Sequence, residues 1–268
     1  MKNDDYQSTG KTKSEEEKFE IKVIDTFSKD TQKPKKRLML WFSPLFIVVV
    51  MIVYFIAGGK KNRGNEILTG NNLSIKEVKI GNQIWMTENL KTTRLNDGTP
   101  IPKVTNNSEW NSLLYIGYCF YDNDEATYKA TYGALYNWNT VNTGKLCPTG
   151  WHVPSDAEWT TLINFLGGDS IAGYKLKETG TVHWNSPNTG ATNESGFTAL
   201  PGGYRYFDGT FHDIGTNGFW WSSTWSSTFN EDIYRAMNFR NGAVYVVNEY
   251  SGLPSIRVGL SVRCIKDK

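Results

Sequence analysis

The sequence predicts an α+β domain of few helices and many short antiparallel strands, preceded by a single transmembrane helix. An uncharged apolar stretch covers residues 38–57, long enough as a helix to span about 30 Å of hydrocarbon. One strongly capped amphipathic helix begins near residue 155. A series of short apolar runs separated by turn residues follows it to the end of the chain.

The composition of the 268-residue chain limits its class. A formal net charge of +2 at pH 7 argues against nucleic acid as a partner, because phosphate binding needs a concentrated basic face. The chain holds 10 Trp, 14 Tyr and 13 Phe beside 25 Gly. Such a composition favours a loop-rich, aromatic-cored extracellular domain over a helical cytosolic enzyme.

The N-terminal part of the chain divides into segments of different composition. Residues 1–37 are densely charged and nearly without aromatics, which predicts a disordered tail, although residues 19–27 could form a short strand or helix on a partner. Residues 38–57 are the expected membrane anchor, with a buried core helix or a cleaved signal peptide as alternatives. Residues 58–72 read as a polar linker, and residues 73–268 as one domain.

Charges beside the apolar stretch predict its orientation. Five basic residues precede it between positions 29 and 37, and three follow it between 60 and 63. Because the flank richer in Lys and Arg stays inside, we expect a cytoplasmic tail and an extracytoplasmic domain. Residues 64–268 carry 16 basic and 19 acidic side chains, a net charge of −3, so this domain is not a polycation that seeks polyanions.

The first elements of the domain are a hairpin and a helix. Apolar residues alternate over residues 76–90 on both sides of Gly81-Asn82, which predicts a two-residue hairpin turn with Gly first. A helix is expected over residues 130–141, where apolar residues recur at helical spacing, although Gly133 weakens the pattern.

The strongest helix signal comes next. Ser155 and Glu158 form a capping box, in which each side chain satisfies an exposed backbone N–H at the start of the helix. Apolar residues then follow at the spacing of one helix face, and Gly167-Gly168 ends the helix. Short strands are expected at 196–206, 209–214, 219–224, 234–240, 243–250 and 257–265, with Asn241-Gly242 as a hairpin turn.

An ordered run of motifs extends from Lys76 to the end of the chain. The motifs are NQIWMTENL (82–90), CFYDNDE (119–125), TYGALYNWNTV (131–141), LCPTGWHVPSDAEWTTL (146–162), SGFTALPGGYR (195–205), FWWSSTW (219–225) and SVRCIKD (261–267). In this order they resemble the Fibrobacter succinogenes major paralogous domain family. That family is similar to the C-type-lectin-like fold of the formylglycine-generating sulfatase-modifying enzymes, whose helix opens with a phrase like Pro154–Trp159.

The resemblance implies a C-type-lectin-like fold and a secreted or surface-attached bacterial protein, without naming a substrate. With the predicted anchor, it implies a single-pass protein of the bacterial inner membrane whose C-terminal domain is periplasmic or extracellular. An uncleaved helix is a departure from the commoner lipoprotein form of the family.

Three cysteines in an oxidising compartment predict one disulfide and one free thiol. The lectin-like fold brings its first helix and its final strand together, so the resemblance implies a Cys147–Cys264 bridge, with three reduced, buried cysteines as the alternative. Cys119 would need a nearby base, such as His152 or His183, to act as a nucleophile. The sulfatase-modifying enzymes use two cysteines near their C-terminal end, and here Cys264 is alone, so that activity is not carried over.

Metal binding has one candidate cluster, because Asp122, Asp124 and Glu125 offer oxygen ligands for a structural calcium ion on an expected loop. An ordinary surface turn is the alternative. The EF-hand pattern is absent, and so are the calcium phrases of sugar-binding lectins, to which residues 184–188 come nearest but lack the acid. The three His have no close pair that would suggest zinc, and no other cofactor is expected.

Tryptophans are the candidates for ligand binding, namely Trp184, Trp220, Trp221 and Trp225. On a strand Trp220 and Trp221 point to opposite faces, so either one packs inward and one outward, or both pack in the core. An exposed Trp can stack on a sugar ring or anchor a protein.

Two function classes follow from these features. The favoured one is a non-catalytic surface module that binds a glycan, a cell-wall polymer or a protein partner. The rival is a hydrolase or modifying enzyme on a lectin-like scaffold, for which Glu194 with Asp208 or Asp213 are possible carboxylate pairs.

Overall fold

The computed structural model describes residues 75–226, 231–248 and 257–268. The chain divides into two units, Met1–Thr69 and Gly70–Lys268, and every described residue belongs to the second unit. The expected tail (1–37), membrane helix (38–57) and linker (58–72) lie outside the described residues. Within the described ranges, no helix has the length and apolar character needed to cross a membrane.

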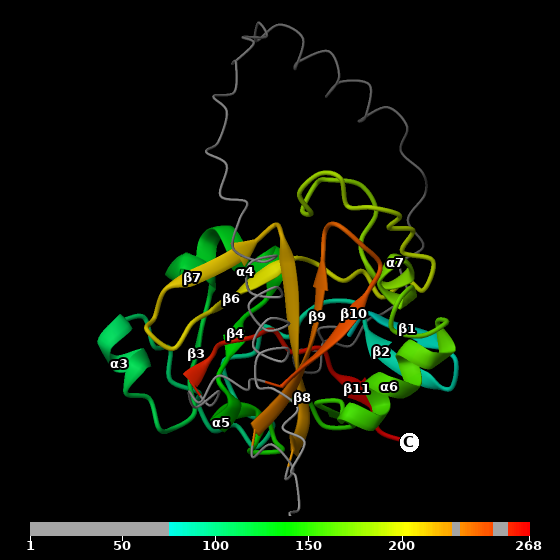
Figure 1. Ribbon diagram of the computed structural model, residues 1–268. Helices are drawn as coiled ribbons and strands as arrows, with labels where there is room; N and C mark the ends of the chain where they lie inside the picture. The colour runs from blue at the N-terminus through cyan, green and yellow to red at the C-terminus, as the bar shows by residue number, and fades with distance from the viewer. Residues whose placement is uncertain (1–74, 227–230, 249–256) are drawn as a thin grey trace, which may run out of the picture. The chain divides into compact units, whose positions relative to one another are not determined.

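The second unit is a mixed α+β fold with few, short helices and mostly antiparallel sheets, which confirms the predicted class (Figure 1). A four-stranded sheet has the order β1-β2-β11-β5, a five-stranded sheet has the order β10-β9-β8-β6-β7, and β3 pairs with β4. The pairing of β6 with β8 is parallel.

The described strands are β1 (Glu77–Ile80), β2 (Gln83–Met86), β3 (Tyr118–Cys119), β4 (Leu135–Tyr136), β5 (Trp151–His152), β6 (Gly202–Arg205), β7 (Phe211–Ile214), β8 (Asn217–Ser226), β9 (Glu231–Asn238), β10 (Val244–Asn248) and β11 (Ile265–Lys266). The described helices are α3 (Asn107–Asn111), α4 (Glu125–Tyr132), α5 (Trp138–Val141), α6 (Asp156–Phe165) and α7 (Ala172–Leu176), with a 3-10 turn η1 (Tyr121–Asn123).

Local signals in the sequence define two of these elements. The β1–β2 hairpin pairs Ile80 with Gln83 across Gly81-Asn82, and Gly81 has a φ of +60°, which Gly adopts without strain. At α6 the Ser155 hydroxyl accepts from the Glu158 N–H at 3.3 Å, and the Glu158 carboxylate accepts from the Ser155 N–H at 2.9 Å. The predicted hairpin and capping box are therefore confirmed.

The single helix expected over residues 130–141 is wrong. α4 ends at Tyr132, β4 intervenes, and α5 begins at Trp138 under an Asn137 cap. Gly133 has a φ of +76°, and a Cβ atom there would lie 2.7 Å from the carbonyl oxygen of Leu90. The helix ends at Gly133 because the backbone there lies directly against the backbone of Leu90.

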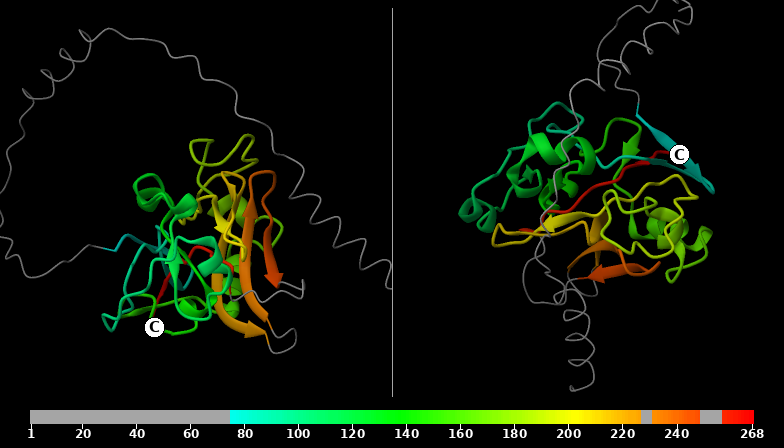
Figure 2. Two further views of the ribbon diagram at one scale, coloured as in Figure 1. Left: turned by 90° about the vertical axis from the view of Figure 1, so that its left-hand side faces the viewer. Right: turned by 90° about the horizontal axis from the view of Figure 1, so that it is seen from above.

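The strands of the second half exist where expected, but their lengths differ. Expected strand 196–206 shortens to β6. Over the expected strand 257–265 the structure has single bridges at residues 259–261, and β11 begins only at Ile265. That last segment is central, since Cys264 O accepts from Met86 N on one side while Ser261 O accepts from Trp221 N on the other. Figure 2 (right) shows the red C-terminal segment running through the middle of the unit.

The core is aromatic, as the composition indicated. Six tryptophans are less than 2% exposed: Trp85, Trp110, Trp159, Trp184, Trp220 and Trp221. Trp85 packs on Trp159 with ring centroids 4.8 Å apart, which joins β2 to α6. This contact fixes the four-stranded sheet against the capped helix.

Candidate functional site

Three of the four candidate ligand-binding tryptophans lie in the core. Trp184, Trp220 and Trp221 are 1%, 0% and 0% exposed. Their indole N–H groups donate within the fold, to Ala199 O, Asn89 Oδ1 and Tyr136 O respectively. No ring face is left for a ligand, which corrects the sequence-based prediction for these three residues.

Trp220 and Trp221 show why the strand pattern left two outcomes open. They do point to opposite faces of β8, since they belong to two different core clusters. Both faces of β8 are covered at this point, so both rings are buried. Of the two outcomes that alternation along a strand allows, the structure has the one in which both residues pack in the core.

Trp225 is the candidate whose ring reaches solvent, with 44% of the residue exposed. Its ring lies 6.3 Å from that of Trp138, which is 3% exposed and lies 5.6 Å from Trp221. Across the sheet, Trp225 pairs with the fully buried Asp232 of β9. The exposed indole is therefore supported by a buried layer of aromatic rings.

The acidic cluster extends from the 3-10 turn η1, which contains Asp122, into the start of α4, and its side chains have separate partners. Asp124 accepts from Thr127 N at 3.1 Å as the cap of α4, and hydrogen bonds from Thr127 lower its pKa. Glu125 contacts Lys103 at 2.8 Å and Lys129 at 2.7 Å, and these hydrogen bonds lower its pKa.

The third member of that cluster behaves differently. Burial, followed by the charge of Asp124, raises the pKa of Asp122, whose backbone has a φ of +51°. Among the described residues, no group of three or more His, Cys, Asp and Glu side chains is arranged to hold a metal ion. The calcium site stays a prediction.

The Cys147–Cys264 disulfide is present, with Cα atoms 6.1 Å apart, which confirms the pairing. Cys119 is free and fully buried. Burial raises the pKa of its thiol to about 12, so the reactive thiolate does not form near neutral pH. Cys119 is thus a buried core residue in this fold.

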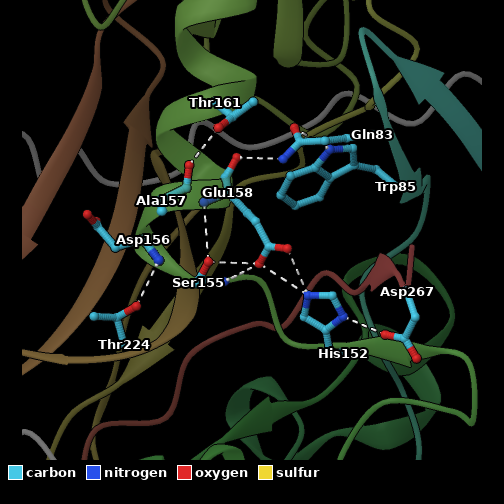
Figure 3. Close-up of polar contacts among 10 residues, drawn as sticks. All are labelled: Gln83, Trp85, His152, Ser155, Asp156, Ala157, Glu158, Thr161, Thr224 and Asp267. Carbon is cyan, nitrogen blue, oxygen red and sulfur yellow. Dashed lines mark hydrogen bonds and ion pairs between the residues drawn. The ribbon is translucent and has the colours of Figure 1, made fainter.

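A polar cluster that the sequence did not indicate surrounds His152 (Figure 3). Its Nδ1 lies 2.6 Å from Asp267 Oδ1, and its Nε2 lies 3.0 and 3.1 Å from the two oxygens of Glu158. The same Glu158 carboxylate accepts from the Ser155 hydroxyl at 2.8 Å. The cluster joins β5, the start of α6 and the end of the chain.

The protonation of this cluster follows from its geometry. Burial opposes a charge on His152, but hydrogen bonds with Asp267 and Glu158 outweigh it and raise the pKa of the ring. Burial likewise opposes the charge on Glu158, but hydrogen bonds from Ser155 and His152 lower its pKa. When the ring is protonated, both of its nitrogens donate to carboxylates, and each nitrogen has a carboxylate partner within the fold. The cluster is suited to holding segments together.

A second histidine, His183, has a carboxylate partner at one ring nitrogen. His183 Nδ1 lies 2.7 Å from Glu178 Oε2, and its ring contacts Tyr132 edge to face at 5.8 Å. Burial, followed by the charge of Glu178, raises the pKa of Tyr132. This is the arrangement of a base oriented by a carboxylate. Within the part of the chain that the structure describes, no hydrogen bond joins His183 to a hydroxyl or thiol nucleophile.

The carboxylates that the sequence offered for glycoside chemistry have local partners. Glu194 contacts Lys175 at 3.0 Å, Asp208 accepts from Thr210, and Asp213 accepts from Asn217. Burial raises the pKa of Asp213. Each of the three carboxylates is thus held by a different partner.

Comparison with known proteins gives one match. The model of the Fibrobacter succinogenes major domain matches residues 78–266, from the first strand to the last. No curated protein and no solved structure matches the chain. Because the matched region covers most of the 268 residues, the chain belongs to the Fibrobacter succinogenes major domain family.

Proposed function

We propose that the protein is a membrane-anchored, extracytoplasmic, non-catalytic module that binds a glycan, a cell-wall polymer or a protein partner. The exposed ring of Trp225 on its support of buried rings carries this proposal. Residues 38–57 would anchor the chain in the bacterial inner membrane with residues 1–37 in the cytoplasm.

Two features support the location and the scaffold. The Cys147–Cys264 disulfide fits an oxidising compartment, since such bonds are rare in the cytosol. The same bond joins the segment before α6 to the residue just before the final strand, in a unit of short antiparallel strands and few helices. This combination supports a C-type-lectin-like fold for the module.

The contact of Trp225 with the buried ring of Trp138 bears on binding. A side chain that packs on a neighbour before binding loses less conformational freedom on binding, so more of its contact energy appears as affinity. The indole offers an apolar face that packs on the C–H face of a sugar ring or on an apolar partner side chain. Tryptophans in such positions are frequent hot spots of recognition.

A ligand screen of the full-length chain tests the proposal. A glycan array and a pull-down would supply candidate ligands, and Trp225→Ala should weaken their binding at least about tenfold, as expected for a hot spot. Phe165→Ala is the matched control, because Phe165 is a 64% exposed aromatic residue on α6. Equal binding by wild type and Trp225→Ala would contradict the assignment of the surface.

The topology has its own test. Protease added to spheroplasts should digest residues 64–268 and spare the tail, because the longer basic cluster precedes the apolar stretch. Loss of the tail with survival of the domain would reverse the orientation.

The rival function, a hydrolase or modifying enzyme on this scaffold, is favoured by the His183–Glu178 pair. Mass spectrometry of the captured ligand after incubation with the protein separates the two functions. Chemical change that His183→Gln abolishes would favour the enzyme, and recovery of intact ligand favours the binding module.

A further inference from the structure

The joining segment, residues 257–268, makes backbone contacts with each of the three described sheets. Through β11 it pairs with β2 and with β5, and in the order β1-β2-β11-β5 it is β11 that joins these two strands. Isolated bridges connect it to β4, β6 and β8 as well. One short segment thus holds strands from all three sheets.

The joining segment is buried along most of its length. Eight consecutive residues, 258–265, are buried. The even-numbered residues from 258 to 264 belong to one core cluster, and Ile265 belongs to a second. At Gly259 a Cβ atom would lie 2.9 Å from Cζ2 of Trp110, which belongs to the third cluster. The three core clusters therefore meet on this segment.

Earlier parts of the chain depend on the joining segment for hydrogen bonds. Its carbonyl groups accept at 2.8–3.1 Å from five backbone N–H groups, those of Met86, Leu90, Tyr136, Arg205 and Trp221. All five residues are buried. A buried backbone group without a partner is costly. Without the segment, these groups would either stay unpaired in the interior or open to water together with the core around them.

Two side chains of the joining segment add to this dependence. Arg263 is 0% exposed and donates to Phe197 O at 2.5 Å and to Asn89 Oδ1 at 2.8 Å. Cys264 forms the disulfide with Cys147, at a sequence separation of 117. All of these partners precede the segment in the sequence. None of the links can form before the segment has been synthesised.

We infer that the joining segment controls when the unit folds: the strands that it connects form no stable unit until residues 257–268 have been synthesised and inserted between them. Contacts between distant residues form late, because closing a long loop costs entropy before the contacts stabilise the fold. The β1–β2 hairpin can form earlier from local contacts, but an isolated hairpin is only marginally stable in water.

This order of folding fits the proposed location. A chain that crosses a membrane through a narrow channel has to stay unfolded during its passage. A joining segment that is synthesised after the strands it connects keeps them unfolded for that time. This use rests on the proposed extracytoplasmic function, whereas the order of folding does not.

Full-length chains held on the ribosome test the order of folding. The chain is translated with lipid nanodiscs in an oxidising buffer, with a short or a long polar linker after Lys268. Residues 257–268 then lie inside or outside the exit tunnel. With the long linker, the unit Gly70–Lys268 should resist protease and contain the Cys147–Cys264 bond. With the short linker, the unit should be digested and the bond should be absent.

Release of the short-linker chain by puromycin is the matched control, and it should restore resistance to protease. A resistant unit before release would overturn the inference, and so would a chain that stays sensitive after release. Because the assay contains no translocation channel, its failure would leave the proposed location standing, and the protease test on spheroplasts examines that location separately.

Hydrogen exchange of the native full-length chain in nanodiscs tests the same dependence at equilibrium. The amides of Leu90 and Tyr136 bond to the joining segment. After correction for intrinsic rates, they should exchange only through the opening that also exposes the β8–β9 ladder. Faster exchange of these two amides than of the ladder would show that the other strands stay folded when the segment detaches, and would overturn the inference.

Discussion

Opening the Cys147–Cys264 bridge is expected to be the most damaging small change to the domain. The bond links residues with a sequence separation of 117. On the chain-entropy estimate, closing a loop of this length in the unfolded chain is worth about 5 kcal/mol at 25 °C. A typical domain has a stability of about 5 to 15 kcal/mol, so the loss would be a large fraction of the total.

The assay is urea unfolding of the unit Gly70–Lys268, followed by the fluorescence of its buried tryptophans. Cys147→Ser and Cys264→Ser should lower the midpoint by the same amount. The double variant should be no worse than either single variant, because each change opens the same loop. Cys119→Ala is the control, since it removes a buried thiol without opening a loop.

Two results would refute this reasoning. Additive effects of the two serine variants would mean that each cysteine stabilises the fold separately, through packing and not through the bond. A non-reducing peptide map with Cys119 in the bridge would contradict the pairing itself.

Three further predictions concern local structure, each measured by urea unfolding of the same unit. Ser155→Ala should cost ~1 kcal/mol by loss of the cap, and Trp159→Ala ~3–5 kcal/mol by opening the core; equal effects would contradict the assigned roles. His152 has a raised pKa, so its stabilisation is complete below the unfolded value of about 6.5 and is lost as pH rises through the folded value. His152→Gln should flatten the dependence of stability on pH over that window, and an unchanged slope would contradict a stabilising role for the polar cluster around His152. Gly133→Ala should cost more than Gly144→Ala, because both have positive φ but a Cβ at Gly144 meets nothing within 4 Å. Similar losses at the two glycines would show that the contact with Leu90 is unimportant.

Local chemistry explains which elements the sequence could predict. A capping box and a Gly-Asn turn act within a few residues, so the start of α6 and the β1–β2 hairpin follow from their own segments. The helix expected over 130–141 failed for a non-local reason. Gly133 allows α4 to end against the Leu90 backbone, and nothing within residues 130–141 shows that this backbone lies there.

Only part of the candidate site could be predicted, because burial too depends on residues far away in the sequence. Alternation along β8 separates Trp220 from Trp221, but burial depends on what covers each face of the sheet. Periodicity therefore could not distinguish the exposed Trp225 from its buried neighbours. The contact of His152 with Asp267 could not be predicted from local sequence, because the two residues are separated by 115 positions.

Buried cations form a different class of unpredicted residues, and they explain how a loop-rich fold is held in place. Arg205, Arg263 and Lys177 are each 0% exposed. In the part of the chain that is described, they pair with no carboxylate; they donate to backbone carbonyls of loops, such as Val104 O, Phe197 O and Asn241 O.

This arrangement follows from the small amount of regular structure. Loops that pack inside a domain leave carbonyl groups without ladder partners, and burying such a group unpaired is costly. An arginine supplies several donors in a fixed plane, so one side chain satisfies carbonyls from separate loops. Arg263 does this for Met86, Phe197 and Thr198, and thereby joins the end of β2 to the loop before β6. From composition alone these cations would be expected at the surface. In the structure these three are buried, and their hydrogen bonds hold loops together inside the domain.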